Sequence, residues 1–138
     1  MNKKETFLNS NCRALIIGSS GAIGDALVVN LKTLIGSKNV VTLSRRHNGL
    51  NLMSPETIEE RSKEQEGKFH LIVDATGALE IDGKGPEKSL SAINHEYMMD
   101  QFMVNAIGPA LIIKHFVRFL PRTGKVVFVT LSARVGSI

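Results

Sequence analysis

A run of small residues near the N-terminus has the types and spacing that a phosphate-binding turn needs. The sequence GSSGAIG contains Gly18, Gly21 and Gly24, and glycine permits a tight turn and a close approach of the backbone to a ligand. Ser19 and Ser20 add hydroxyl donors. Between a strand and a helix, such a turn offers free N–H groups and the helix dipole to a pyrophosphate. A plain glycine-rich turn is the alternative, and the flanking residues favour nucleotide binding.

The residues after the second expected strand indicate which dinucleotide would bind. NAD-binding folds of this kind place an acid about 20 residues after the glycines, on the ribose 2′-hydroxyl. Here Ser44 stands at that point, and Arg45 and Arg46 follow it. Guanidinium groups suit a 2′-phosphate, which they pair in bidentate fashion. A solvated basic loop is the alternative; with the glycine turn upstream, we predict NADP rather than NAD.

The elements that must position these residues alternate between strand and helix. Short apolar runs predict strands at residues 13–17, 39–43, 69–75 and 125–131, with a very short further strand at 50–52. Apolar residues at helical spacing predict helices over residues 22–35, 54–65 and 95–120. Apolar runs without alternation indicate a parallel sheet covered on both faces. We therefore predict an α/β fold with a Rossmann-like, doubly wound parallel sheet, truncated after the fifth strand.

Length and composition exclude several classes of protein. At roughly 150 residues per domain, 138 residues make one domain, which we divide into a lead-in at 1–11 and a dinucleotide-binding domain at 12–138. Cys12 is the only cysteine, so no intramolecular disulfide can form. No apolar run reaches the roughly 18 residues of a membrane span, and the N-terminus lacks an apolar signal core. We expect a cytoplasmic protein without a metal site, because its four histidines lack ligand spacing.

Five segments, in this order, carry a resemblance to a known family. They are IGSSGAIG, TLSRR, VDATG, VNAIGP and VFVTLSARVG. With them the whole chain resembles the N-terminal part of the short-chain dehydrogenases/reductases, with closest likeness to the C-factor-like, or C-signal-like, branch. The resemblance implies an NADP-dependent oxidoreductase that transfers a hydride between the nicotinamide and an unknown small carbonyl or alcohol.

The resemblance also implies a cofactor site. The matching positions are Gly18, Ser19, Ser20, Gly21, Ile23, Gly24, Ser44, Arg45, Arg46, Asn51, Ala75, Thr76 and Gly77. Ala22 replaces the family's usual middle glycine, and Gly21 gives a spacing closer to the extended branch. Asn51 stands where the family often has an aspartate that contacts adenine. Asp74 replaces an asparagine of the family's Asn-Asn-Ala-Gly segment.

Two further positions match groups near the family's chemistry. Asn105 matches an asparagine that organises a proton-relay water from a long helix. Pro109, four residues on, has no N–H for the Asn105 carbonyl, which would leave that oxygen free to accept from water in a kinked helix. The alternative is that Pro109 only bends a core helix. Ser132 is the candidate for the catalytic serine, although alignment on Gly136 puts Ala133 at the usual position.

The family's general acid–base pair, Tyr-x-x-x-Lys, does not occur in these 138 residues. The single tyrosine is Tyr97, and Gln101 stands four residues after it. General acid–base chemistry needs a titratable group within hydrogen-bond reach. We therefore expect an N-terminal part that is inactive alone.

Other functions and partners remain open at this point. A non-catalytic dinucleotide-binding or C-factor-like signalling module is the main alternative. A nucleic-acid binder is the weakest, because the net charge is only +4, aromatic residues are 5% and no helix-turn-helix pattern occurs. The strand at 125–131 would form an exposed apolar edge, so we expect a homo-oligomer or a complementing C-terminal chain, and neither nucleic acid nor membrane as partner.

Overall fold

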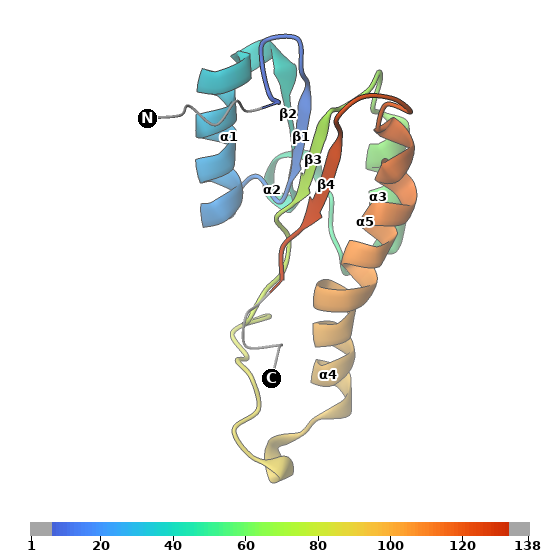
Figure 1. Cartoon of the computed structure of the whole chain (residues 1–138). Coiled ribbons are helices and arrows are strands. Elements are labelled where there is room, and N and C mark those ends of the chain that lie inside the picture. Colours follow the sequence, from blue (N-terminus) through green and yellow to red (C-terminus); the bar gives the residue numbers. More distant parts are fainter. Residues whose placement is uncertain (1–6, 133–138) are drawn as a thin grey trace.

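A four-stranded parallel sheet carries helices on both faces (Figure 1). The computed structural model describes residues 7–132. The strand order is β2-β1-β3-β4, and the strands are β1 (Ala14–Ile17), β2 (Val40–Leu43), β3 (Leu71–Asp74) and β4 (Val127–Thr130). Every pairing is parallel, so the predicted α/β fold with a doubly wound parallel sheet is confirmed.

The prediction of a short strand at residues 50–52 is wrong, and the described sheet has four strands rather than five. The backbone polar groups of Asn51 are used locally instead. Its N–H donates to the Thr57 hydroxyl at 2.9 Å, and its carbonyl accepts from the same hydroxyl at 3.0 Å. Leu50 and Leu52 are buried in the core. Their apolar character is therefore explained by burial beside the start of the next helix and not by pairing in the sheet.

Alternate residues of β1 supply two separate cores. Ala14 and Ile16 face helix α1 (Ala22–Ile35) and pack with its Val28, Leu31 and Ile35. The other side of the same strand belongs to a larger core that includes Ile58 of α3 (Pro55–Lys63) and Ile112 and Phe116 of α5 (Gly108–Phe116). A strand buried on both faces explains why this segment is apolar without alternation.

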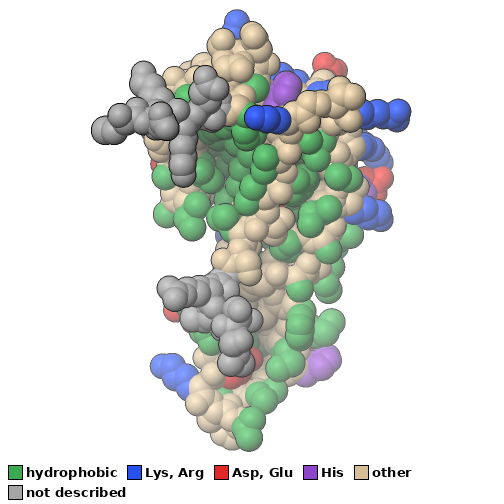
Figure 2. Space-filling view, viewed as in Figure 1, with side chains coloured by type: hydrophobic (Ala, Val, Ile, Leu, Met, Phe, Trp, Pro, Cys, Tyr) green, Lys and Arg blue, Asp and Glu red, His purple; other side chains and the backbone are tan. Residues whose placement is uncertain are grey.

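On the face of the sheet against which α1 packs, the strands are covered unevenly. Among the described helices, α1 packs against β1 and β2, and β4, at the edge of the sheet, keeps Val129 only partly buried. Figure 2 shows hydrophobic side chains gathered on this face between α1 and α5.

The long helix predicted at residues 95–120 is continuous but not uniform. It consists of α4 (His95–Phe102), a π-helical segment (Met103–Ile107), α5 and a final 3₁₀ turn (Val117–Phe119). The Gly108 N–H donates to the Met103 carbonyl five residues earlier, and Pro109 follows in the first turn of α5. The predicted disturbance at Pro109 therefore takes the form of a π segment just before it, as is common near functional sites.

By length and composition alone, the run His95–Phe119 could cross a membrane, since its most apolar 18-residue window has a mean hydropathy of 1.2. Its Ile112, Phe116 and Phe119 are buried in the larger core, and 22% of the most apolar window is buried inside the described structure. Two further 3₁₀ turns, Ser37–Asn39 and Leu90–Ala92, complete the described helices together with α2, which belongs to the site.

Candidate functional site

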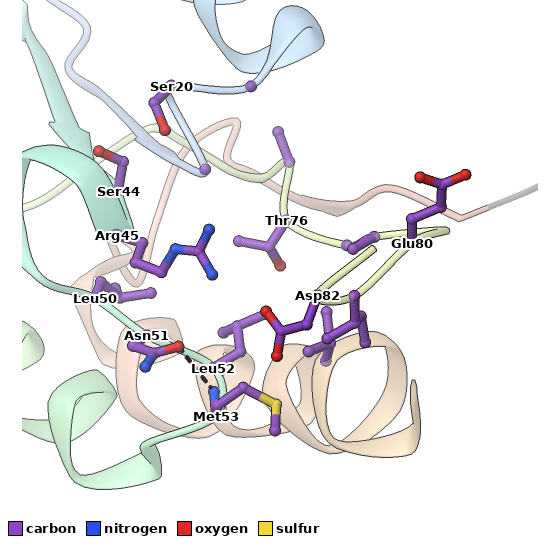
Figure 3. A pocket seen from close by; sticks show the side chains of 17 residues that line it. Ser20, Ser44, Arg45, Leu50, Asn51, Leu52, Met53, Thr76, Glu80 and Asp82 are labelled. Atoms are coloured by element: carbon purple, nitrogen blue, oxygen red, sulfur yellow. Dashed lines mark hydrogen bonds between the residues drawn. The ribbon is translucent and has the colours of Figure 1, made fainter. Parts of the chain in front are cut away.

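A cleft of about 630 Å³ opens where the strands β1, β2 and β3 reach their carboxyl ends (Figure 3). In open parallel sheets, ligands bind at this edge, where the strand order reverses, and here β2 and β3 lie on opposite sides of β1. The volume suits a small-molecule site. The predicted cofactor residues that line it are Gly18, Ser20, Gly21, Ser44, Arg45, Asn51, Ala75, Thr76 and Gly77.

The other predicted cofactor residues do not line the cleft. The buried Ser19 donates its hydroxyl to the Leu43 carbonyl at 3.2 Å, so it fastens the turn to β2. Ile23 is 60% exposed on α1, and Arg46 is exposed on the surface. Gly24 is buried beneath the turn.

Close packing explains two of the three glycines in the turn. Gly18 has φ +84°, and a Cβ there would lie 2.8 Å from the carbonyl carbon of Ala75 on the neighbouring strand end. A Cβ on Gly24 would lie 2.9 Å from the carbonyl carbon of Gly18 and still closer to its oxygen. A Cβ on Gly21 would meet only the Gly18 oxygen, at 3.5 Å. Gly18 and Gly24 are therefore fixed by geometry, and Gly21 borders open space.

The start of α1 is available to an anion. Gly21 is its N-cap, and no side chain caps the helix. The first N–H groups of a helix have no partner within the helix, and together with the helix dipole they favour negative charge. Ser20, exposed beside them, also lines the cleft. This wall can accept a phosphate through backbone N–H groups and a hydroxyl.

A short helix that the sequence did not predict contains both arginines. In α2 (Arg45–Asn48), the Ser44 hydroxyl accepts from the His47 N–H at 3.1 Å, and Asn48 Oδ1 accepts from the Ser44 N–H at 3.2 Å. Ser44 is buried and serves as the N-cap. The Arg45 side chain extends across the cleft toward Thr76 (Figure 3). The local signal was present, because serine is among the residues preferred at the N-cap of a helix.

The end of β3 is held by a buried carboxyl. Asp74 is fully buried, and its Oδ1 accepts from both the N–H and the hydroxyl of Thr76. Its Oδ2 is buried without a hydrogen-bond partner among residues 7–132. Burial raises the pKa of Asp74, and the hydrogen bonds from Thr76 oppose that rise. Asp74 thus fixes the turn that places Thr76 and Gly77 at the cleft.

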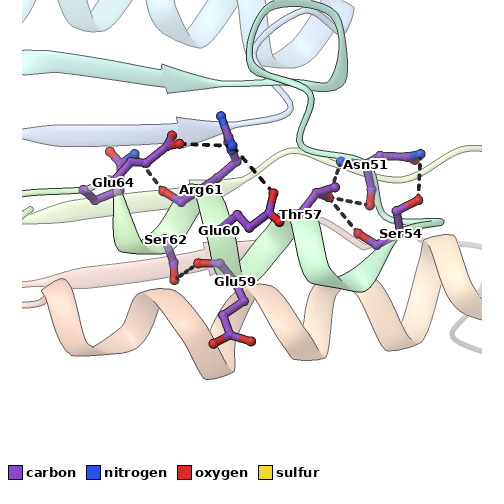
Figure 4. Close-up of polar contacts among 9 residues, drawn as sticks. Asn51, Ser54, Thr57, Glu59, Glu60, Arg61, Ser62 and Glu64 are labelled. Carbon is purple, nitrogen blue, oxygen red and sulfur yellow. Dashed lines mark hydrogen bonds and ion pairs between the residues drawn. The ribbon is translucent and has the colours of Figure 1, made fainter.

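Asn51 reaches the cleft from the loop before α3. Its Oδ1 accepts from the Met53 N–H at 3.1 Å, and its Nδ2 lies 3.5 Å from the Ser54 hydroxyl. Figure 4 shows Asn51, Ser54 and Thr57 tied together at this helix start, with Arg61, Glu60 and Glu64 paired at the other end. The local contacts hold Asn51 in place as part of the cleft wall.

A third wall, which the sequence analysis did not identify, comes from residues 78–84, named here the strap. Ala78, Glu80, Ile81 and Asp82 all line the cleft. Ile81 and Lys84 exchange two backbone hydrogen bonds of 3.0 Å. The two residues between them have positive φ, +51° at Asp82 and +77° at Gly83. An Asp-Gly pair is a strong signal for a two-residue hairpin, so this sequence contained the clue.

Neither candidate for the chemistry lines the main cleft. The Asn105 side chain accepts from the Ala78 N–H and donates to the Ala78 carbonyl, both at 2.9 Å. Its second amide hydrogen points to Gln101 Oε1 at 2.9 Å. Ser132 is exposed just after β4, and no hydrogen bond joins it to Asn105 within the described residues. Ala133 and Gly136, which set its register, lie outside those residues.

No group of three or more His, Cys, Asp and Glu side chains in residues 7–132 is placed to hold a metal ion.

Comparison with known proteins identifies the fold. No family model matches the sequence, and no curated protein matches it. The structure is similar to NADPH-bound carbonyl reductase from chicken fatty liver, with a TM-score of 0.66, 18% identity, and coverage of 92% of this chain and 60% of that one. It is similar to the aldohexose dehydrogenase of Thermoplasma acidophilum, with a TM-score of 0.70, 18% identity, and coverage of 91% and 52%.

A small-chain dehydrogenase gives a TM-score of 0.72 at 17% identity, with coverage of 92% of this chain and 62% of that one. The chain therefore spans between about half and two thirds of the length of these three structures. At this level of identity the likeness establishes the fold: this chain has the Rossmann-like architecture of the short-chain dehydrogenases/reductases.

Proposed function

We propose that the cleft binds NADP(H), and that this chain supplies the cofactor-binding part of an oxidoreductase of the short-chain dehydrogenase/reductase type. One observation carries the proposal. An uncapped helix N-terminus, an arginine and the ends of β1, β2 and β3 converge on one cleft of about 630 Å³. The NADPH bound to the similar carbonyl reductase supports the choice of cofactor.

The residues present fit such a ligand. The pyrophosphate would lie at the start of α1, where Gly21 leaves open space and Ser20 adds a hydroxyl. Arg45 makes no ion pair within 4 Å among the described residues, so its guanidinium is available to a 2′-phosphate. Asn51 and Thr76 would face the adenosine half. When bound, the nicotinamide supplies the hydride donor or acceptor of the reaction.

A non-catalytic dinucleotide-binding or C-factor-like signalling module is the second candidate. One observation favours it: the 138 residues contain no Tyr-x-x-x-Lys. We propose that the 138-residue chain by itself binds the dinucleotide without turnover, and that any substrate is a small carbonyl or alcohol.

Fluorescence titration of the purified chain with NADPH and with NADH tests the proposal. Saturable binding with preference for NADPH is expected. If neither nucleotide binds, both candidate functions are wrong. Carbonyl-dependent oxidation of NADPH, followed at the absorbance of the reduced nicotinamide, would show that the chain is active and would exclude the non-catalytic module.

We also propose that two copies of the chain associate through the helical run of α4 and α5. Its outer side exposes large hydrophobic residues at helical spacing, namely Met99, Phe102, Ile107, Ile113 and Val117, which are 40–55% exposed. Contiguous apolar patches on a surface mark interaction sites. A two-fold axis near Ile107 would place the stripe of one copy against the stripe of the other.

Charge along the same run fits an antiparallel pair. Glu96 and Asp100 lie at its start, and Lys114 and Arg118 lie near its end. In an isologous, two-fold contact the acidic end of each copy meets the basic end of its partner. Sedimentation velocity is expected to show a dimer that Asp100→Lys weakens and that the double variant Asp100→Lys/Lys114→Asp restores. A wild-type chain that stays monomeric at high concentration would contradict this proposal and would favour a different chain as partner.

A further inference from the structure

Within residues 7–132, no hydrogen bond or ion pair joins the strap's own side chains to the rest of the cleft, so other contacts must hold the strap there. One anchor is Ile81, which is partly buried and packs against the larger core. The remaining contacts come from one side of α4 and the π segment. They involve three polar side chains that neither the phosphate turn nor the arginine requires.

These side chains, Tyr97, Gln101 and Asn105, follow one another at intervals of four residues, which places neighbours on one face of a helix. Asn105 Nδ2 donates to Gln101 Oε1 at 2.9 Å. Gln101 Nε2 in turn donates to the Tyr97 hydroxyl oxygen. The result is a continuous ladder of hydrogen bonds along the helix.

The ladder grips both ends of the strap. At the first end, Asn105 makes two bonds of 2.9 Å to the backbone of Ala78, and Gln101 Nε2 donates to the Leu79 carbonyl at 3.3 Å. At the far end, the hydroxyl of Tyr97 donates to the Lys84 carbonyl. Tyr97 is buried, at 6% exposure, so its hydroxyl is held out of bulk water.

The same ladder also packs behind the wall of the cleft. A Cβ on Gly77, which lines the cleft, would lie 3.3 Å from Asn105 Oδ1. Asn105 therefore backs the point where β3 passes into the strap. A wall that is fixed before the ligand arrives spares the complex the loss of conformational freedom that ordering a loop would require.

We propose that Tyr97, Gln101 and Asn105 form a latch that holds the strap as a preformed wall of the nucleotide cleft. They are positioning residues, because they act on the ligand through Ala78–Lys84 backbone contacts. The effect on the ligand rests on the proposed NADP(H) binding, and the effect on the strap does not. Two measurements therefore separate a failure of the latch from a failure of the proposed function.

Amide hydrogen exchange tests the latch without any ligand. Tyr97→Phe removes the hydroxyl and keeps the buried ring, and Gln101→Met keeps the side-chain length. Each is expected to speed exchange at the Ile81 and Lys84 amides about fivefold, the weight of roughly one hydrogen bond. Exchange at β3 should not change, which would distinguish loosening of the strap from general destabilisation.

Because the rungs act as one unit, the double variant should exchange hardly faster than either single variant. His95→Gln, an exposed position on the same helix, is the matched control and should leave exchange as in the wild type. Unchanged exchange at Ile81 and Lys84 in both single variants would overturn the latch.

Stopped-flow displacement of NADPH tests the effect on the ligand. Tyr97→Phe and Gln101→Met are expected to raise the dissociation rate constant about fivefold, in step with exchange, since most affinity changes appear in dissociation. Faster exchange with unchanged NADPH dissociation would overturn the proposal that the strap is a wall of the site. A wild-type chain that binds no dinucleotide would refute the proposed function, and the exchange experiment alone would then decide on the latch.

Discussion

The glycine turn and the strap form two walls of one cleft, and they are held in place by different means. Close backbone packing fixes the turn, since Gly18 lies against Ala75 and Gly24 lies against Gly18. The strap is fixed by side chains that come from a helix about 20 residues further along the chain. The turn tolerates no added atom at Gly18 or Gly24, and the strap depends on a few hydrogen bonds.

This difference teaches where each wall is vulnerable. A substitution that causes a steric clash in the turn destabilises the whole fold, because the strands β1 and β3 and the helix α1 meet there. An error in the latch acts on the strap alone, whose Asp82-Gly83 tip is exposed. We therefore expect variants of the turn to change stability and variants around the strap to change ligand binding.

The largest effect is expected from Gly24→Ala. The new Cβ would collide with the Gly18 carbonyl, and overpacking of a tight site destabilises a protein by about 3 kcal/mol. Urea unfolding followed by circular dichroism measures the loss. Gly21→Ala is the matched control: φ at Gly21 is −80°, and the nearest atom to its added Cβ would be 3.5 Å away. We expect a loss of about 1 kcal/mol or less, the cost of alanine at an N-cap. Equal losses in the two variants would show that close packing does not govern the turn.

A smaller effect, confined to binding, is expected from the arginines. Arg45→Asp should raise the Kd for NADPH about 10- to 100-fold, because charge-assisted hydrogen bonds to the 2′-phosphate would be lost. The Kd for NADH, which has no such phosphate, should rise much less, by about the two- to fivefold expected from a new carboxylate near its pyrophosphate. Arg46→Asp is the control at the neighbouring position, since Arg46 does not line the cleft. Titrations of both nucleotides against both variants measure the contrast, and an equal loss with Arg46→Asp would argue for a diffuse basic patch.

The turn and the Asp82-Gly83 hairpin have local signals in the sequence, whereas the contacts that anchor the strap have none, for a physical reason. The contact of Gly24 with Gly18 lies within a short stretch of chain, whereas Gly18 meets the distant backbone of Ala75. Both glycines are nevertheless recognisable in the sequence, because their spacing between a strand and a helix is typical of a phosphate-binding turn. Asn105 was singled out for a carbonyl freed by Pro109, yet its side chain turned out to bond Ala78, 27 residues away. No local pattern encodes that pairing. Tyr97 looked inert for the same reason.

Two other differences follow from competition between local and tertiary contacts. The apolar Leu50 and Leu52 were expected in a strand, and burial beside the start of α3 explains them equally well. Arg45 and Arg46 were expected to act together. The Ser44 cap turns the chain into α2, which brings only Arg45 to the cleft. Whether Ser132 takes part in the chemistry stays a prediction.

A weaker effect of opposite sign is expected at the tip of the strap. Asp82 lines the cleft proposed for a polyanion, so its carboxylate should repel the phosphates. Asp82→Asn is expected to tighten NADPH binding about two- to fivefold at low salt and less at high salt, where charges are screened. Titration at two ionic strengths measures this, with Glu66→Gln, an exposed position away from the cleft, as the control for loss of a carboxylate elsewhere. Tightening that persists at high salt would point to a change in strap structure instead.

The smallest effect concerns Asp74, where the two walls meet at the end of β3. Burial raises the pKa of Asp74 in the folded protein above the ordinary aspartate value, which holds in the unfolded chain. At a pH between these two pKa values, folding therefore takes up a proton. The free energy of unfolding falls as the pH rises from the unfolded-state pKa through the folded-state pKa. Asp74→Asn keeps an acceptor for the Thr76 N–H and hydroxyl but carries no charge. Its stability relative to the wild type should therefore increase from acidic to neutral pH, by about 1 kcal/mol or less.

Urea unfolding of Asp74→Asn across this pH range, against the exposed control Glu66→Gln, checks the sign. A stability difference that does not vary with pH would mean that Asp74 titrates as an ordinary carboxyl. A difference that falls toward neutral pH would mean that its charged form is stabilised. In that case a group outside residues 7–132, or a bound cation, would have to face the Oδ2 that lacks a partner within them, and the end of β3 would belong to the electrostatics of the cleft as much as Arg45 does.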